Sequence, residues 1–133
     1  MSNELVLVRH GETAGQSSVR LYGSTDIVLS DLGRDQMARV RDALAGVAFA
    51  ATVTSQLLRA RESARIICNG THPDARIVRD FREIDFGAWE GMTYEEIAET
   101  DPEGYARWEK SGAHSAFPGG DAKAAFYQRV GQA

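Results

Sequence analysis

The chain has 133 residues, of which 43% are hydrophobic and 26% are charged. This length and balance are typical of one globular domain with its own core. A formal net charge of −4 gives no basic field, so we expect no nucleic-acid partner. No apolar run approaches the ~20 residues of a membrane-spanning helix, and the N-terminus has no secretory signal pattern. We therefore expect no membrane partner, and the lone Cys68 suits a cytoplasmic location.

The first half of the chain alternates predicted strands and helices. Short apolar or β-branched runs predict strands, and apolar residues that recur at helical spacing predict helices. The strands are expected at residues 4–8, 51–55 and 75–78, and the helices at residues 31–45 and 57–68. This order indicates parallel strand pairing with right-handed crossovers, and hence an α/β fold.

The second half is predicted to be mostly helical. Thr93 and Glu96 have the spacing of a capping box, which predicts a short helix directly after Thr93. Further helices are expected to begin near Asp101-Pro102 and Asp121. We expect one domain over residues 1–133, with a helical, lid-like insertion at about residues 93–120.

The segment from Arg9 to Thr13 directly follows the first predicted strand. Open α/β sheets bind ligands at the carboxyl ends of their strands. Arg9 offers a planar fork of donors that matches phosphate oxygens, and His10 offers a nucleophile that is neutral near physiological pH. A backbone carbonyl in the loop opened by Gly11 is the expected acceptor for the second ring nitrogen of His10. The alternative is a structural histidine without a catalytic role.

Arg59 and Glu83 are the other residues expected at this site. Arg59 follows the second predicted strand, which aims it at the same sheet edge as Arg9, although a solvated surface arginine is the alternative. Two guanidinium groups there could hold a phosphate and stabilise its transition state. Glu83 lies in an apolar stretch, and a carboxyl group in an apolar setting suits a general acid. Asp85 and Glu90 are rivals for that role, and a salt bridge to a nearby arginine is the structural alternative.

These motifs resemble the signature of the histidine phosphatase superfamily, the phosphoglycerate-mutase-like proteins. The resemblance extends in order through residues 7–13, 29–33, 55–60, 82–91 and 117–121, together with Gly23 and Asp26. It implies a three-layer α/β/α fold with a mostly parallel sheet. It also implies that His10 is phosphorylated, that Glu83 donates a proton, and that no metal or organic cofactor takes part. Arg9 and Arg59 are implied as phosphate ligands.

The substrate site is expected to include four further residues. Thr13 can donate a hydroxyl, and Gln16 can reach a phosphate oxygen with its amide. Tyr22 and Gly23 are expected to influence specificity. Residues 83–97 resemble the phosphatase branch, in particular α-ribazole-phosphate and broad-specificity phosphatases. We therefore expect hydrolysis of the phosphoric monoester of a small metabolite through a phosphohistidine, with a phosphoglycerate-type phosphomutase as the alternative.

The sequence departs from the family pattern at two points. The family often has Trp-Asn where this chain has Gly15-Gln16. The family's second catalytic histidine, on a later strand, is also missing, and neither His72 nor His114 has that context. We expect the chain to be the N-terminal portion of a longer enzyme, without its C-terminal strands and with little activity alone. The alternatives are a sheet completed by a second copy in a homodimer, and a short non-catalytic module that binds phosphate or a protein.

Overall fold

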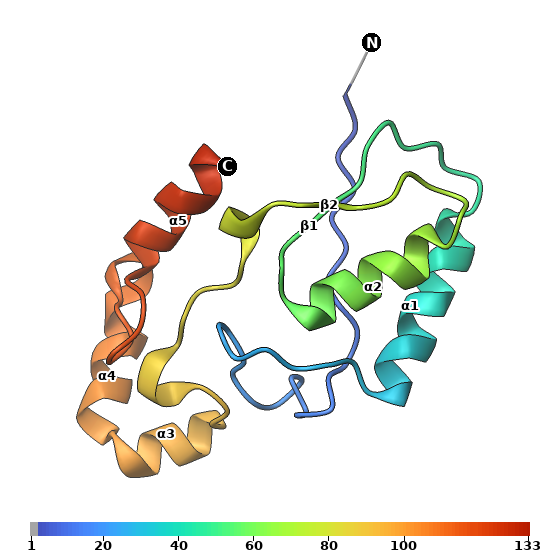
Figure 1. Ribbon diagram of the computed structural model, residues 1–133. Coiled ribbons are helices and arrows are strands. Elements are labelled where there is room, and N and C mark those ends of the chain that lie inside the picture. The colour runs from blue at the N-terminus through green and yellow to red at the C-terminus, as the bar shows by residue number, and fades with distance from the viewer. Residues whose placement is uncertain (1–2) are drawn as a thin grey trace.

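The computed structural model describes residues 3–133, apart from the side chain of Ala113. Its helices are α1 (Asp31–Leu44), α2 (Leu58–Cys68), α3 (Tyr94–Thr100), α4 (Pro102–Ser111) and α5 (Lys123–Gln132). Its strands are β1 (Val53–Thr54) and β2 (Arg76–Ile77), and short 3₁₀ turns are η1 (Arg79–Phe81), η2 (Gly87–Trp89) and η3 (Gly112–His114). Figure 1 shows α1 and α2 on one side of the strands and α3–α5 on the other. Over the described residues, no helix has both the length and the apolar character needed to cross a membrane.

The two strands pair in parallel, with Val53 opposite Arg76 and Thr54 opposite Ile77. Helix α2 connects them, as in a βαβ unit, and it packs against β1 and α1. The predicted α/β class and the parallel pairing are therefore confirmed. Each strand is shorter than the sequence predicts.

Capping residues place the helix ends close to their predicted positions. Ser30 caps α1, because its hydroxyl accepts a hydrogen bond from the Gly33 amide at 3.1 Å. Helix α2 ends at Asn69, which adopts the left-handed conformation with a φ of 30°. Thr93 and Glu96 form the predicted capping box at the start of α3. Each such cap stabilises its helix by about 1 kcal/mol, so local sequence fixes these boundaries.

Two apolar clusters hold the described chain together. The first joins α1 to α2 and consists of Leu29, Met37 and Ile67. The second joins the loop around η2 to α3 and to the segment before α5, and it consists of Ile84, Trp89, Ile97 and Phe117. Burial of one large apolar side chain contributes about 1.5–3 kcal/mol. The second cluster therefore anchors the stretch that carries the candidate carboxylates Glu83 and Glu90.

The predicted buried strand at residues 4–8 is wrong. Within residues 3–133, this segment makes no backbone hydrogen bond, and Leu5 and Leu7 are 80% and 84% exposed. Apolar composition indicates a tendency to be buried, but a strand also needs a neighbour whose N–H and C=O groups face its own. In the part of the chain described, β1 pairs with β2 alone, so residues 4–8 have no such neighbour.

Candidate active site

His10 directly follows residues 4–9 and is half-buried. Its Nδ1 donates to the carbonyl of Gly11 at 2.7 Å, so the backbone acceptor expected from the sequence is present. A proton held on Nδ1 leaves the lone pair of Nε2 free to attack an electrophile. The pKa of His10 lies below its ordinary value, chiefly because burial disfavours the charged ring. The Gly11 carbonyl acts to raise this pKa, whereas the charges of Arg59 and Arg9 lower it further.

Arg59 lies in the first turn of α2 and is only 2% exposed. Its Nη1 donates to the Thr25 carbonyl at 2.9 Å, and its Nη2 donates to the carbonyls of Tyr22 and Gly23 at 3.0 and 2.7 Å. A guanidinium group has five N–H donors, so these three bonds leave two for a ligand. The predicted proximity of Arg59 to His10 agrees with the structure, because its charge acts on the imidazole. Arg59 is thus held in a fixed orientation beside the candidate nucleophile.

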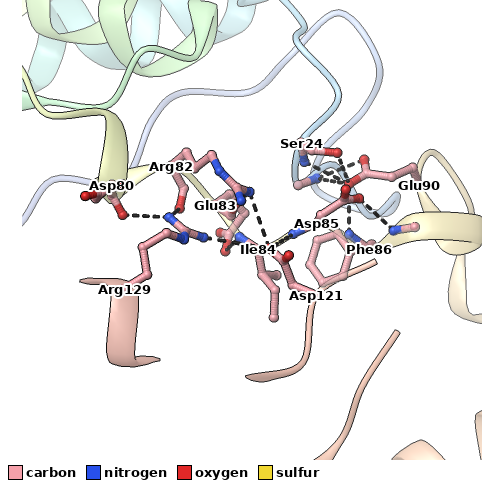
Figure 2. A network of polar contacts seen from close by, with 12 residues as sticks. Ser24, Asp80, Arg82, Glu83, Ile84, Asp85, Phe86, Glu90, Asp121 and Arg129 are labelled. Carbon is pink, nitrogen blue, oxygen red and sulfur yellow. Dashed lines mark hydrogen bonds and ion pairs between the residues drawn. The ribbon is translucent and has the colours of Figure 1, made fainter. Parts of the chain in front are cut away.

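Glu90 fixes the loop whose carbonyls bind Arg59, and Figure 2 shows its carboxylate beside Ser24 and Phe86. Its carboxylate accepts from four backbone amides, those of Gly23 (3.0 Å), Ser24 (2.8 Å), Thr25 (3.4 Å) and Phe86 (3.0 Å). Burial acts to raise the pKa of Glu90, but these hydrogen bonds hold it below its ordinary value. The carboxylate stays ionised, and through the 22–25 loop it aligns the carbonyls that bind Arg59.

Arg9 is exposed and lines an open cavity of about 370 Å³. Ser17, Ser18 and Tyr94 are among the other residues of its wall. Arg20, which is paired with Glu96, and Glu95 also line it, so the cavity combines two guanidinium groups, a carboxylate, two hydroxyl-bearing residues and an aromatic ring. This set of groups can contact a phosphate and the polar group attached to it.

The apolar setting predicted for Glu83 is wrong. Its side chain is exposed, whereas the adjacent Ile84 is buried in the second apolar cluster. Successive side chains of extended backbone point in opposite directions, so burial of Ile84 turns Glu83 away from the core. Oε1 of Glu83 accepts from the Ile84 amide at 2.8 Å. Its negative charge acts on His10, so the carboxylate lies near the candidate nucleophile.

The four residues predicted to bind substrate have unequal access to it. Thr13 is buried, and its hydroxyl accepts from the Ser17 amide at 3.2 Å, so it braces the loop. Gln16 is exposed and has a φ of 62°, which is uncommon for a residue other than glycine. Tyr22 and Gly23 act through their main-chain carbonyls, as described above. Of the four, Gln16 has the most exposed side chain.

Gly15 replaces the tryptophan that is frequent in the family, and the structure gives a steric reason. A Cβ atom at Gly15 would lie 2.6 Å from Cζ of Tyr22 and would also clash with Ile27. The Tyr22 ring therefore occupies the space that a side chain at position 15 would need.

Three carboxylates organise the site without having been assigned a role from the sequence. Glu12 accepts from amides and a hydroxyl of the loop that follows it. Asp26 accepts from the Leu58 amide at 2.6 Å and so caps α2 beside its arginine. Asp121 accepts from the Asp85 amide at 3.0 Å (Figure 2). All three lie in motifs that resemble the family, but their donors could not be read from the sequence.

The other histidines lie elsewhere in the described chain. His72 is buried and packs edge-on against Phe49, with ring centroids 4.9 Å apart. His114 belongs to η3. Neither is among the groups whose charge acts on His10. Across residues 3–133, no three His, Cys, Asp or Glu side chains are grouped so that they could hold a metal ion.

Comparison with known proteins gives one family. The model of the histidine phosphatase superfamily (branch 1) matches residues 5–133. The chain is 30% identical over 126 residues to the adenosylcobalamin/α-ribazole phosphatase of Escherichia coli K12. The aligned region covers 95% of this chain and 62% of that protein. It is 32% identical over 129 residues to phosphoserine phosphatase 1 of Hydrogenobacter thermophilus, and the aligned region covers 96% of this chain and 60% of that protein. The crystal structure of the α-ribazole phosphatase from Shigella flexneri superposes with a TM-score of 0.82 at 28% identity. The superposition covers 94% of this chain and 62% of that structure.

The chain thus spans 60–62% of the length of these relatives. Within that span its fold is α/β and phosphoglycerate-mutase-like, as the resemblance implied. The matched range includes positions 10, 59 and 83, and the charges of Arg59 and Glu83 act on His10. The chain belongs to the histidine phosphatase superfamily, branch 1.

Proposed function

We propose that this chain carries the nucleophilic half of a phosphoric monoester hydrolase, with a phosphohistidine as intermediate. The observation that carries the proposal is the 2.7 Å hydrogen bond from His10 Nδ1 to the Gly11 carbonyl, which leaves Nε2 unprotonated. The lowered pKa of His10 supports it, because the ring is then neutral at physiological pH. Membership of the family supports it further, since relatives bear the names of phosphatases.

In the proposed reaction, Nε2 of His10 attacks phosphorus in line with the ester oxygen. The P–O bond breaks as the P–N bond forms, and Glu83 gives its proton to the leaving alkoxide. Arg9 and the two free donors of Arg59 stabilise the charge on the transferring oxygens. Water then attacks the phosphohistidine and gives a proton back to the Glu83 carboxylate, the P–N bond breaks, and inorganic phosphate leaves. We propose a small phosphorylated metabolite as substrate, because relatives are named as phosphatases of α-ribazole and of phosphoserine.

A single-turnover experiment tests the proposal. The protein is mixed with p-nitrophenyl phosphate, and p-nitrophenolate release is followed for the wild type, for His10→Ala and for His114→Ala. We expect His10→Ala to lower the rate by about 10³-fold or more, as removal of a nucleophile does. His114 is exposed and serves as the matched control, so its variant should keep the wild-type rate. An undiminished rate in His10→Ala would overturn the proposal.

A non-catalytic phosphate-binding module is the second candidate function. It is favoured by the positions of His72 and His114, since neither acts on His10. The module would bind inorganic phosphate through Arg9 and Arg59 without forming phosphohistidine. Phosphate binding that is lost in Arg59→Met, together with no p-nitrophenolate release from the wild type, would support this candidate over the hydrolase.

A further inference from the structure

Arg129 of α5 reaches back to the stretch that carries Glu83. Its Nη1 donates to the carbonyl of Asp80 and to the carbonyl of Arg82, at 2.6 and 2.9 Å. These carbonyls lie three residues and one residue before Glu83. The backbone on one side of Glu83 is therefore tied to a helix that lies more than forty residues later.

Asp121 ties down the other side of the same stretch. Its Oδ2 accepts from the amide of Asp85 at 3.0 Å and from Nη1 of Arg82 at 3.3 Å. Its own amide donates to the Asp85 carbonyl at 2.9 Å. Oδ2 also lies 3.8 Å from Nη2 of Arg129, so the Asp121 carboxylate contacts both the Asp85 amide and the arginine that binds the carbonyls before Glu83 (Figure 2).

The two segments approach so closely that glycines are required between them. A Cβ atom at Gly120 would clash with the Asp85 carbonyl, and one at Gly87 would clash with the Pro118 carbonyl. Gly87 also has a φ of 56°, which side chains other than glycine rarely adopt. The main chain of residues 85–87 therefore packs directly against the main chain of residues 118–121, next to Glu83.

We propose that Asp121 and Arg129 are positioning residues for Glu83. They hold the backbone at positions 80, 82 and 85, so the Glu83 carboxylate keeps one placement although its side chain is exposed. The bond from the Ile84 amide to Oε1 of Glu83 reports that placement. The proposal rests on the proposed function only in taking Glu83 as the proton donor.

A purely structural role for Asp121 and Arg129 makes a different prediction. Loss of a structural tie would lower the stability of the whole chain, and every activity would fall together. Loss of a positioning contact would affect mainly the step in which Glu83 gives its proton. The two roles therefore separate when leaving groups of different basicity are compared, because p-nitrophenolate departs without a proton and an alkoxide does not.

The test compares Asp121→Asn with Glu62→Gln. Glu62 is a matched control, since it also accepts from one backbone amide, that of Leu29 at 3.1 Å, and from one arginine, Arg34 at 2.7 Å. It lies on α2 and makes none of the contacts at positions 80–85. The first readout is the exchange rate of the Ile84 amide by NMR, which needs no catalysis. We expect about a tenfold faster exchange in Asp121→Asn, as for the loss of one hydrogen bond to a charged group, and a change below about twofold in Glu62→Gln.

The second readout is the single-turnover rate with p-nitrophenyl phosphate and with glycerol phosphate. We expect Asp121→Asn to lower the glycerol phosphate rate by about tenfold or more and to leave the other rate within about twofold. If Asp121→Asn fails to fold, Arg129→Lys replaces it, because lysine keeps the charge but loses the donor fork. Unchanged Ile84 exchange, or equal losses with both substrates, would overturn the positioning role. If the wild type acts on neither substrate and forms no phosphohistidine, the proposed function fails while the exchange readout still decides the placement of Glu83.

Discussion

Replacement of Glu90 by glutamine tests whether one carboxylate organises the loop that holds Arg59. The glutamine carbonyl can take the place of Oε1 and keep the amides of Gly23, Ser24 and Phe86, at 3.1, 2.8 and 3.0 Å. Its NH₂ group would then face the Thr25 amide, which now donates to Oε2 at 3.4 Å. A hydrogen bond to a charged group contributes about 1.5–3 kcal/mol and a neutral one about 1 kcal/mol. Three weakened bonds and one lost bond therefore lower the free energy of unfolding by at least about 3 kcal/mol.

Urea denaturation at pH 7 measures this loss, with Glu99→Gln as the control. Glu99 is exposed on α3, so its replacement should change the free energy of unfolding by less than about 0.5 kcal/mol. The pKa of Glu90 is lowered in the folded chain, so its contribution is present above the ordinary carboxyl pKa. It is lost as the pH falls through the lower folded value, and the penalty of Glu90→Gln should shrink below about pH 4. A loss below about 0.5 kcal/mol at pH 7, or a penalty that does not depend on pH, would refute the reasoning.

Two further predictions follow from the same stretch of structure. First, His10 should titrate below the ordinary 6.5 of histidine when its ring protons are followed by NMR, because burial and the charges of Arg59 and Arg9 oppose protonation. Titration at or above 6.5 would show that the Gly11 carbonyl and Glu83, which favour protonation, outweigh them. Second, Gly23→Ala should lower the free energy of unfolding by about 3 kcal/mol in urea, because its Cβ would clash with the Ile84 carbonyl and approach Oε1 of Glu90. Gly46→Ala meets no atom within 4 Å and should be neutral or slightly stabilising, so equal effects of the two changes would count against the tight packing of Gly23.

Local signals explain why much of the fold could be predicted. Ser30, Asn69 and the Thr93–Glu96 pair act on atoms within a few residues of themselves, so their effect can be read from sequence. Residues 4–8 show the limit of such reasoning. Their apolar composition predicts a buried strand, but strand formation depends on a neighbour that sequence pattern does not identify.

The candidate site shows the same division. His10 and its Gly11 acceptor are adjacent in sequence, and the predicted hydrogen bond is present. The role of Glu90 could not be predicted, because its donors at Gly23 and Ser24 lie 67 and 66 residues away. The exposure of Glu83 also escaped prediction, since it depends on which way Ile84 turns to reach the core.

The most direct test of the central claim, that His10 attacks phosphorus through Nε2, is to identify which ring nitrogen becomes phosphorylated. The protein is incubated with a phosphoryl donor such as p-nitrophenyl phosphate and quenched in base, and NMR then assigns the P–N bond to one ring nitrogen. Because Nδ1 donates to the Gly11 carbonyl, we predict phosphorylation of His10 at Nε2, and none in His10→Ala. Phosphorylation at Nδ1, at another residue, or at no residue would contradict the account.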